Sequence, residues 1–265
     1  MQKGGGVRVG LVPTMGYLHA GHLSLVGIAR EQCDQTVVSL FVNPTQFGPT
    51  EDFSCYPRDE QRDLALCEQA GVDVVFCPEP GDMYAEDASV SVDEAHLSQD
   101  LCGAVRPGHF RGVCTVVAKL FHLVQPDVAV FGQKDAQQLA VIRRMVRDLF
   151  FPITIVAGPI IREADGLAMS SRNVYLSAEE RKQALGLYQC LRQAQVLFRE
   201  GCRQGQVLER LLRVFLGERY PGLTVEYVVC RDPDTLAACD RLVSGTLIAV
   251  AAKAGRTRLI DNELL

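Results

Sequence analysis

The chain has 265 residues, of which 48% are hydrophobic and 22% are charged, so it has the composition of an ordinary globular protein with one large core or two domains. Its formal net charge of −5 gives no basic surplus, and Lys and Arg form no dense run, so nucleic acid and anionic membranes are poor candidate partners. No stretch approaches membrane-spanning length without a charge. A phosphate ligand would therefore have to be held by local features of the chain.

The ten cysteines are scattered without a C-x-x-C pair, and most have apolar neighbours, as Cys114 does. This pattern favours reduced cysteines that act as small hydrophobic residues over disulfide, redox or metal-binding roles. Residues 1–6 contain no apolar stretch of the kind found in signal peptides. We therefore expect a cytoplasmic protein.

The first strand is predicted over 7–12, an apolar run that leads into P-T-M-G-Y-L-H-A-G-H at 13–22. This segment places an H-x-G-H pair where a strand gives way to a helix. Free backbone N–H groups and the positive end of the dipole attract anions to a helix N-terminus, and glycine lets an anion approach the main chain. His19 and His22 would then project toward the same bound group and donate hydrogen bonds to phosphate oxygens.

A single H-x-G-H also occurs by chance in unrelated proteins, and a histidine in a loop is usually a solvated or structural residue. The interpretation as a nucleotide site therefore depends on matching segments further along the chain.

Alternating elements continue after this segment. A helix with one apolar side leads to a buried strand over 36–42, which the Asn43-Pro44 pair should stop. Apolar residues at helical spacing indicate a second helix with Gly71 as its C-terminal cap, and a third strand follows over 72–76. The apolar positions are Leu23, Leu25, Val26 and Ile28 in the first helix and Leu64, Cys67 and Ala70 in the second.

Residues 77–112 show neither period, and an irregular stretch of this length in a compact domain usually marks a functional lid or a small insertion. It contains R-P-G-H-F-R-G at 106–112, where two arginines and a histidine among glycines would suit an anionic substrate. A solvated turn explains the same residues, and without other support it is the favoured interpretation.

A helix is predicted from Val113 to Val124, before Pro126, and a short buried strand over 128–131. The segment F-G-Q-K-D-A-Q-Q then leads into a helix. In this segment Lys134 could neutralise phosphate oxygens, while the Asp135 carboxylate could contact a magnesium shell or a ribose hydroxyl. A surface turn with an adjacent ion pair is the alternative. The apolar face of the helix comprises Leu139, Ile142, Met145, Val146 and Leu149.

A fifth strand is predicted over 153–156, and the loop after it leads to A-M-S-S-R-N at 168–173. The two hydroxyls and the arginine of this segment could wrap triphosphate oxygens as pyrophosphate leaves. The alternative is a serine-rich loop before the next helix, for which S-A-E-E at 177–180 is a capping box.

Helices that alternate with short apolar strands predict an α/β fold with a Rossmann-like, doubly wound parallel sheet, in which ligands bind beyond the carboxyl ends of the strands. From about residue 158 the pattern changes and predicts a smaller α+β C-terminal domain over 159–265 that would close over the nucleotide as a lid. Its elements would be helices at 177–200 and 206–218 and strands at 223–230, 246–253 and 256–260, the last two joined by a hairpin at Ala254-Gly255.

Taken together, these segments closely resemble one family, the pantothenate synthetases or pantoate–β-alanine ligases. The resemblance covers the N-terminal two thirds of the chain and is carried by P-T-M-G-Y-L-H-A-G-H, F-V-N-P-T-Q-F, R-P-G-H-F-R-G-V, V-Q-P-D, F-G-Q-K-D-A-Q-Q-L and M-S-S-R-N-V-Y-L. H-x-G-H with a later M-S-S-R is also similar to the wider nucleotidyltransferase superfamily that includes class I aminoacyl-tRNA synthetases.

The resemblance implies an ATP-dependent ligase, in which pantoate and ATP form pantoyl adenylate and pyrophosphate and β-alanine then displaces AMP to give pantothenate. Domain 1–158 would bind nucleotide and pantoate. Mg²⁺ would arrive with ATP, held mainly by the phosphates, with no metal site of the protein's own. Members of the family are commonly homodimers and usually begin with a further helix before the first strand.

The resemblance also assigns site residues. His22, the proton donor, would be catalytic together with His19, Lys134 and Arg172. Gln46 and Gln138 would bind pantoate, and Gln46 would also border β-alanine. The ATP site would comprise Met15, Gly16, Tyr17, Leu18, His19, Ala20, Gly21, His22, Gly132, Gln133, Lys134, Asp135, Ile161, Met169, Ser170, Ser171 and Arg172.

Two rival functions stay open from the sequence. The first is another H-x-G-H nucleotidyltransferase or acid-activating ligase, acting on a different small carboxylic acid or on RNA, although the acidic balance argues against RNA. The second is a noncatalytic nucleotide-binding regulator, against which the presence of both histidines, Lys134 and Arg172 argues.

Overall fold

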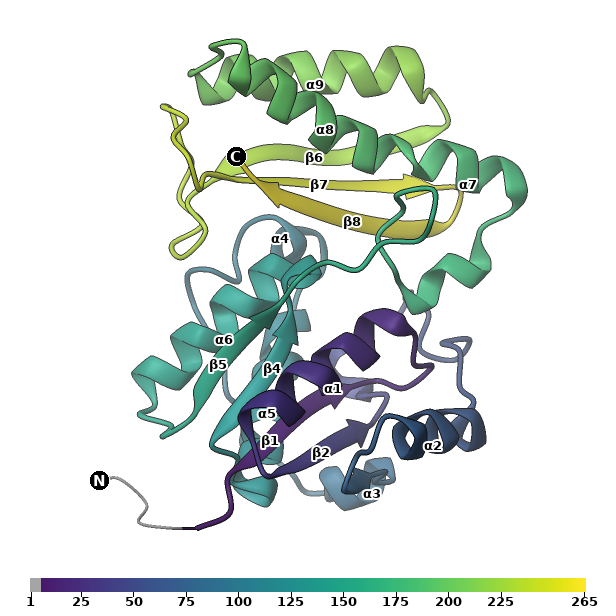
Figure 1. The fold of residues 1–265 in the computed structure, drawn as a ribbon, viewed down its shortest axis with the longest axis vertical. Coiled ribbons are helices and arrows are strands. Elements are labelled where there is room, and N and C mark those ends of the chain that lie inside the picture. Colours follow the sequence, from purple (N-terminus) through teal and green to yellow (C-terminus); the bar gives the residue numbers. More distant parts are fainter. Residues whose placement is uncertain (1–5) are drawn as a thin grey trace. The chain divides into compact units, whose positions relative to one another are not determined.

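The computed structural model describes residues 6–265 (Figure 1). The expectation that residues 1–6 form no signal peptide therefore lies outside the described residues, apart from Gly6. The described residues group into two compact units, which are taken in turn below. The first runs up to Gly132 and resumes over Gln137–Pro159, and the second comprises Gln133–Ala136 and Ile160–Leu265. The functional division into domains at residue 158 stays a prediction. Within residues 6–265, every helix is too short or too polar to span a lipid bilayer.

The first unit is built on a five-stranded parallel sheet in the order β3-β2-β1-β4-β5. The strand order reverses between β1 and β4, and ligands of doubly wound sheets bind at such a switch point. This confirms the predicted Rossmann-like sheet. The strands are β1 (Val9–Thr14), β2 (Gln35–Leu40), β3 (Val74–Phe76), β4 (Val128–Gly132) and β5 (Thr154–Gly158).

The boundaries of the first two strands differ from the prediction. β1 continues through Pro13 to Thr14, in parallel register with β2. Proline is tolerated there because the pairing of β1 with β4 involves only Gly10 and Leu11, so its missing N–H costs no bond on that side. β2 ends at Leu40 rather than at residue 42.

Helices flank this sheet and supply its core. Leu25, Val26 and Ala29 of α1 are buried against β-strand residues such as Val12 and Val130. Gly71, at φ +70°, ends α2 as predicted, and its N–H donates to Glu68 O. The helices are α1 (Ala20–Gln32), α2 (Glu60–Gln69), α3 (Pro80–Met83), α4 (Cys102–Val105), α5 (His109–Val124) and α6 (Ala136–Asp148), with a 3₁₀ turn, η1 (Pro44–Gln46).

Three further expectations for this unit, besides the strand boundaries, are wrong. Residues 77–112 are not irregular throughout, because α3, α4 and the start of α5 lie within them. α5 begins at His109, ahead of the predicted Val113, and His109 is buried rather than part of a solvated turn. Leu149 lies beyond the end of α6 and is 52% exposed, so it is not part of the apolar face.

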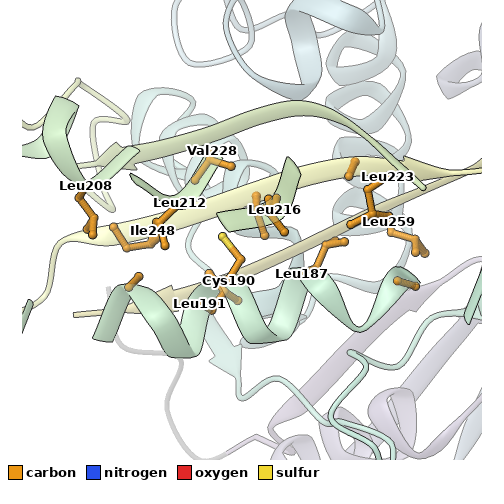
Figure 2. Packing of buried hydrophobic residues seen from close by; sticks show 14 of the residues in the cluster. Leu187, Cys190, Leu191, Leu208, Leu212, Leu216, Leu223, Val228, Ile248 and Leu259 are labelled. Atoms are coloured by element: carbon orange, nitrogen blue, oxygen red, sulfur yellow. The ribbon is translucent and has the colours of Figure 1, made fainter. Parts of the chain in front are cut away.

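The second unit pairs an antiparallel sheet, in the order β6-β7-β8, with two helices layered on one face (Figure 1). Figure 2 shows the resulting core, in which α8 contributes Leu187 and Leu191 and α9 contributes Leu212 and Leu216. The elements are α7 (Ala178–Ala184), α8 (Gly186–Arg199), α9 (Gly205–Arg219), β6 (Leu223–Arg231), β7 (Leu247–Ala254), β8 (Thr257–Leu264) and the 3₁₀ turns η2 (Gln133–Asp135) and η3 (Ser171–Tyr175).

The capping box at Ser177 and the hairpin at Gly255, where φ is +58°, are confirmed. The single helix predicted over 177–200 is wrong, because α7 ends at Ala184 and a separate helix, α8, begins at Gly186. A Cβ at Gly186 would lie 2.6 Å from the Tyr220 ring, so glycine allows this close packing at the junction. β8 also continues to Leu264, beyond the predicted residue 260.

Candidate active site

Thr14, the last residue of β1, links the turn between β1 and α1 to the neighbouring strand β2. Thr14 Oγ1 donates to Ser39 O at 2.7 Å and accepts from Gly16 N–H at 3.1 Å. Gly16 and Tyr17 both have positive φ, +79° and +50°, and a left-handed conformation is unfavourable for tyrosine. The turn therefore needs support from outside to keep this shape.

That support comes from α2. The Asp63 side chain, 2% exposed as a residue, accepts from Tyr17 N–H at 2.6 Å and from Leu18 N–H at 2.7 Å. Its neighbour Arg62 donates to Leu18 O at 2.8 Å and lies over the Tyr17 ring. The N–H groups of Tyr17 and Leu18 and the carbonyl of Leu18 are thus bonded to charged side chains. Such hydrogen bonds are stronger than those between neutral groups.

The two histidines form a reciprocal cap at the N-terminus of α1. His19 is the N-cap residue, and its Nδ1 accepts from Gly21 N–H at 3.1 Å, while His22 Nδ1 accepts from His19 N–H at 3.4 Å. The rings stack with centroids 4.0 Å apart. Because Nδ1 accepts in both residues, each neutral ring carries its proton on Nε2, the nitrogen that can donate to a ligand. The two side chains therefore present paired donors at a helix N-terminus.

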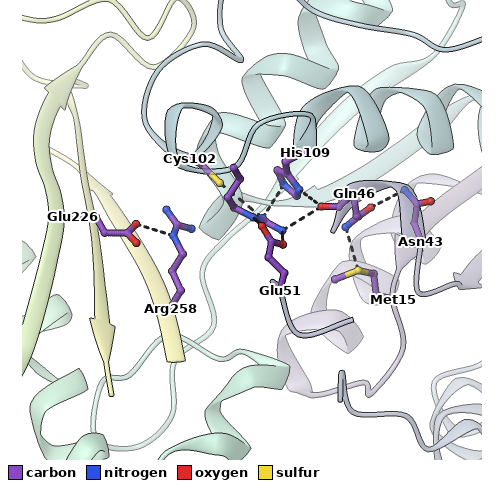
Figure 3. A network of polar contacts seen from close by, with 9 residues as sticks. Met15, Asn43, Gln46, Glu51, Cys102, His109, Glu226 and Arg258 are labelled. Atoms are coloured by element: carbon purple, nitrogen blue, oxygen red, sulfur yellow. Dashed lines mark hydrogen bonds and ion pairs between the residues drawn. The ribbon is translucent and has the colours of Figure 1, made fainter. Parts of the chain in front are cut away.

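Gln46 is tied to the same region of the first unit. It ends η1 and is 8% exposed, and its Oε1 accepts from Asn43 Nδ2 at 3.1 Å while its Nε2 donates to Met15 Sδ at 3.1 Å (Figure 3). Gly112 of α5 packs below it, where a Cβ would lie 2.4 Å from Thr45 O. The structure thus brings the pantoate candidate Gln46 beside the first residue of the candidate ATP segment.

Arg106 and His109, from the R-P-G-H-F-R-G motif, support the backbone of Gln46. His109 Nδ1 donates to Gln46 O at 2.9 Å, and Arg106 also reaches this carbonyl at 3.3 Å. Arg106 Nε donates to Glu51 Oε1 at 2.8 Å, and a second bond joins it to Oε2. Burial alone would raise the pKa of the Glu51 carboxyl, but the hydrogen bond and charge of Arg106 lower it. Arg106 and His109 of this motif therefore hold the backbone at the end of η1, whereas Arg111 of the same motif is exposed.

The second pantoate candidate, Gln138, lies half-buried on α6. Its neighbour Gln137 is buried and structural, since its Oε1 accepts from Cys102 N–H at 2.9 Å and its Nε2 donates to Leu97 O and Asp100 O, each at 2.7 Å. Gln137 thus holds the loop before α4.

In the second unit, Lys134 and Asp135 form η2 and an ion pair of 3.8 Å. Asn262 of β8 donates through Nδ2 to Gln133 O at 3.0 Å and to Lys134 O at 2.8 Å. The four residues 133–136 belong to this unit through such contacts, although Gly132, which ends β4, belongs to the first.

The M-S-S-R segment follows a small hairpin in the second unit. Ile161 O accepts from Met169 N–H at 2.9 Å, and Arg162 bridges to Ala168. Ser170 is the N-cap of η3 and accepts from Arg172 N–H at 3.3 Å. Ser171 is buried and Arg172 half-buried. The second unit resumes at Ile160, nine residues before Met169, so the segment lies within this unit.

The structure therefore assembles the predicted site residues in two groups. The first unit holds residues 15–22 and Gly132 with Gln46 and Gln138, and the second holds 133–135, Ile161 and 169–172. Convergence of the two groups on one triphosphate stays a prediction. Within residues 6–265, no group of three or more His, Cys, Asp or Glu side chains is arranged to hold a metal ion.

Sequence reasoning missed several supporting residues: Arg62, Asp63, Asn43, Gln137 and Asn262. Asn43 bonds Gln46, three positions away, and also Gly112 O, 69 positions away, and the other four act on groups distant in the chain, up to 129 positions for Asn262 and Gln133. A local pattern carries no signal for such contacts. Asn43 and Gln137 stand in two segments that carry the family resemblance, F-V-N-P-T-Q-F and F-G-Q-K-D-A-Q-Q-L, but those segments do not indicate their contacts.

Comparison with known proteins identifies the family. The family model described as pantoate-beta-alanine ligase matches residues 1–264. A pantothenate synthetase from Thermoanaerobacter sp. (strain X514) is 54% identical over 263 residues, which are 99% of this chain and 93% of that protein. The crystal structure of pantothenate synthetase from Thermus thermophilus superposes with a TM-score of 0.93 at 49% identity, covering 97% of this chain and 92% of that one.

A more distant solved structure carries ligands. The pantoate-beta-alanine ligase from Francisella tularensis, complexed with beta-gamma ATP and beta-alanine, superposes with a TM-score of 0.80 at 33% identity and covers 97% of this chain and 90% of its own. Because the sequence, the motifs and the fold agree over nearly the whole length, this chain belongs to the pantoate-beta-alanine ligase family.

Proposed function

We propose that this chain condenses pantoate with β-alanine to give pantothenate at the expense of ATP. A pantoate carboxylate oxygen attacks the α-phosphorus of ATP, the bond from that phosphorus to the bridging oxygen breaks, and pyrophosphate leaves. The β-alanine amine then attacks the acyl carbon of the pantoyl adenylate, loses a proton, and releases AMP. The mixed anhydride supplies the leaving group, so the protein needs only to align the reactants and stabilise developing charge.

The observation that carries this proposal is the reciprocal His19/His22 cap at the N-terminus of α1, in a chain whose F. tularensis relative was crystallised with beta-gamma ATP and beta-alanine. His22 donates to the phosphate oxygens on which charge develops, and His19 contacts them beside it. Residues 15–22 form one wall of the ATP site. Gln46 and Gln138 bind pantoate, because an amide can donate to a carboxylate and accept from hydroxyls.

The second unit supplies most of the other groups of the ATP site in this proposal. Lys134 neutralises phosphate oxygens, and Ser170, Ser171 and Arg172 hold the departing pyrophosphate. Mg²⁺ enters as the complex with ATP, bound mainly by the phosphates. The residues that line the nucleotide are Gly132, Gln133, Asp135, Ile161 and Met169.

No cysteine takes part in this mechanism. None of the ten cysteines, all of which lie within residues 6–265, forms a disulfide bond, and burial raises the pKa of Cys114, Cys190 and Cys230 to about 12, so these three remain thiols rather than nucleophilic thiolates. Cysteines outside disulfide bonds also fit a reducing compartment such as the cytoplasm. From the family resemblance we also propose that the protein is a homodimer. Light scattering tests this, because a dimer has twice the mass of one chain.

Exchange of labelled pyrophosphate into ATP tests the proposed function. We expect exchange only when pantoate is present, because the reversible step is formation of pantoyl adenylate. Other small hydroxy acids should replace pantoate poorly, and added RNA should not change the rate. Equal exchange without pantoate, or exchange that needs RNA, would contradict the proposal.

A further inference from the structure

Lys134 owes its backbone position to the last strand of the chain. The Asn262 side chain on β8 belongs to a residue only 3% exposed, and its Nδ2 bonds both Gln133 O and Lys134 O. Both partners are carbonyl oxygens, which only accept, so the amide must face η2 with its nitrogen. One buried side chain therefore fixes two successive peptide groups.

The neighbouring residue of β8 performs a similar task. Asp261, also 3% exposed, accepts from Arg162 at 2.6 and 3.0 Å, and Arg162 lies over the Tyr188 ring at 4.3 Å. Arg162 belongs to the hairpin that leads to the M-S-S-R segment. Asp261 Oδ1 also accepts from Asn262 N–H at 2.8 Å, so the carboxylate that holds Arg162 is hydrogen-bonded to the residue that holds η2.

We propose that Asn262 is a positioning residue for Lys134 in adenylate formation, an inference that rests on the proposed role of Lys134. η2 is only three residues long, and the chain on either side of residues 133–136 belongs to the first unit. So short a turn has little hydrogen bonding of its own. The Asn262 amide sets the two peptide planes, and with them the direction in which the Lys134 side chain leaves the main chain. An error of 1 Å in such a group can cost about 10²-fold in rate.

Asn262→Asp is the sharpest test, because it keeps the size of the side chain and turns an oxygen toward the two carbonyls. We expect kcat of pantoate-dependent exchange to fall about tenfold or more, since both carbonyls lose their donor. The KM for pantoate should stay within about twofold, because Gln46 and Gln138 lie in the first unit. Asn262→Ala removes the donor without adding charge and serves as the second variant if Asn262→Asp does not fold.

Two further variants separate positioning from stability. In a Lys134→Ala background, Asn262→Asp should cost less than about twofold in kcat, because no ammonium remains to be positioned. Leu212→Ala, in the fully buried core of the same unit, should lower the melting temperature without changing kcat.

The outcomes are distinguishable. The inference would be overturned if both Asn262 variants kept kcat within about twofold of the parent. It would also be overturned if Asn262→Asp lowered kcat in the Lys134→Ala background by the same factor as in the parent. Either result would leave the proposed function intact. Unchanged exchange in Lys134→Ala would remove both this inference and the proposed role of Lys134.

Discussion

His19 and His22 share a motif but differ in what their rings do for the fold. His19 caps α1 through a bond of 3.1 Å, whereas the bond that His22 accepts is long, 3.4 Å. Removing an N-cap costs about 1 kcal/mol of stability. The second histidine can therefore be changed with less damage to the helix, which makes it the better residue for separating catalysis from folding.

We expect His22→Ala to lower the rate of pantoyl adenylate formation by roughly 10²-fold, because it removes a donor that stabilises charge in the transition state. The melting temperature should stay close to that of the parent. Pyrophosphate exchange and thermal unfolding measure the two effects. His122→Ala, at an exposed histidine of α5, is the control and should leave both unchanged. A His22→Ala enzyme with the parent's exchange rate would refute the assignment.

Glu51 makes the stability of the first unit depend on pH. Burial raises the pKa of its carboxyl, but the hydrogen bond and charge of Arg106 outweigh this and hold it below the ordinary value of 4.5. The unfolded chain therefore takes up the proton at a higher pH than the folded one. The stabilisation is complete above about pH 4.5 and is lost as the pH falls through the folded pKa.

We expect the difference in free energy of unfolding between the parent and Glu51→Gln to be largest near pH 7 and to shrink below pH 4.5. Urea unfolding at a series of pH values measures it. Asp148→Asn is the control, because its ion pair with Arg147 is exposed and contributes little to stability. A difference that stays constant from about pH 7 to about pH 3 would show that the Glu51–Arg106 pair does not titrate in this way.

At the scale of elements, the β1–α1 turn depends on a helix that follows it by about 45 residues. Asp63 of α2 satisfies two N–H groups of a turn that contains a left-handed tyrosine. Without these bonds, the entry of the chain into α1, and so the stacked pair of histidines, loses its support. α2 thereby acts on the site through the turn.

We expect Asp63→Asn to lower kcat of the exchange reaction about tenfold, because its NH₂ group would face one of the two N–H donors and leave it unsatisfied. The amide keeps the size of the side chain, so a change in packing does not explain the loss. Asp59→Asn, at the N-cap of the same helix, is the matched control and should change stability only slightly. Full activity of Asp63→Asn would show that the turn keeps its shape without the second bond.

The contrast between these elements and the prediction from sequence has a physical basis. The strand-to-helix transition at 13–22 is local, and so its pattern predicts both the fold and the place of the histidines. The R-P-G-H-F-R-G motif is not local in this sense, because its Arg106 pairs with Glu51, 55 positions away. From the sequence alone, the same residues look like a solvated turn, since glycine and charge dominate them.

At the scale of the whole molecule, the two units have separate cores, and the residues proposed to bind ATP divide between them. Those proposed to bind pantoate belong to the first unit alone. The alternation of strands and helices predicts the first unit well, but the attachment of residues 133–136 to β8 depends on a contact between the middle and the end of the chain. ATP should therefore affect both units when it binds, whereas pantoate should affect only the first.

We expect saturating Mg²⁺ and ATP, without pantoate, to slow amide hydrogen exchange in peptides from both units, at 15–22, 133–136 and 169–172. The reason is that N–H groups bound to phosphate, and turns ordered by it, open less often. Pantoate alone should protect only peptides around Gln46 and Gln138, and α9, whose Leu212 and Leu216 lie in the core, should show no change with either ligand. Protection by ATP confined to residues 15–22 would contradict a common triphosphate site, because Lys134 and Arg172 would then take no part in binding the nucleotide.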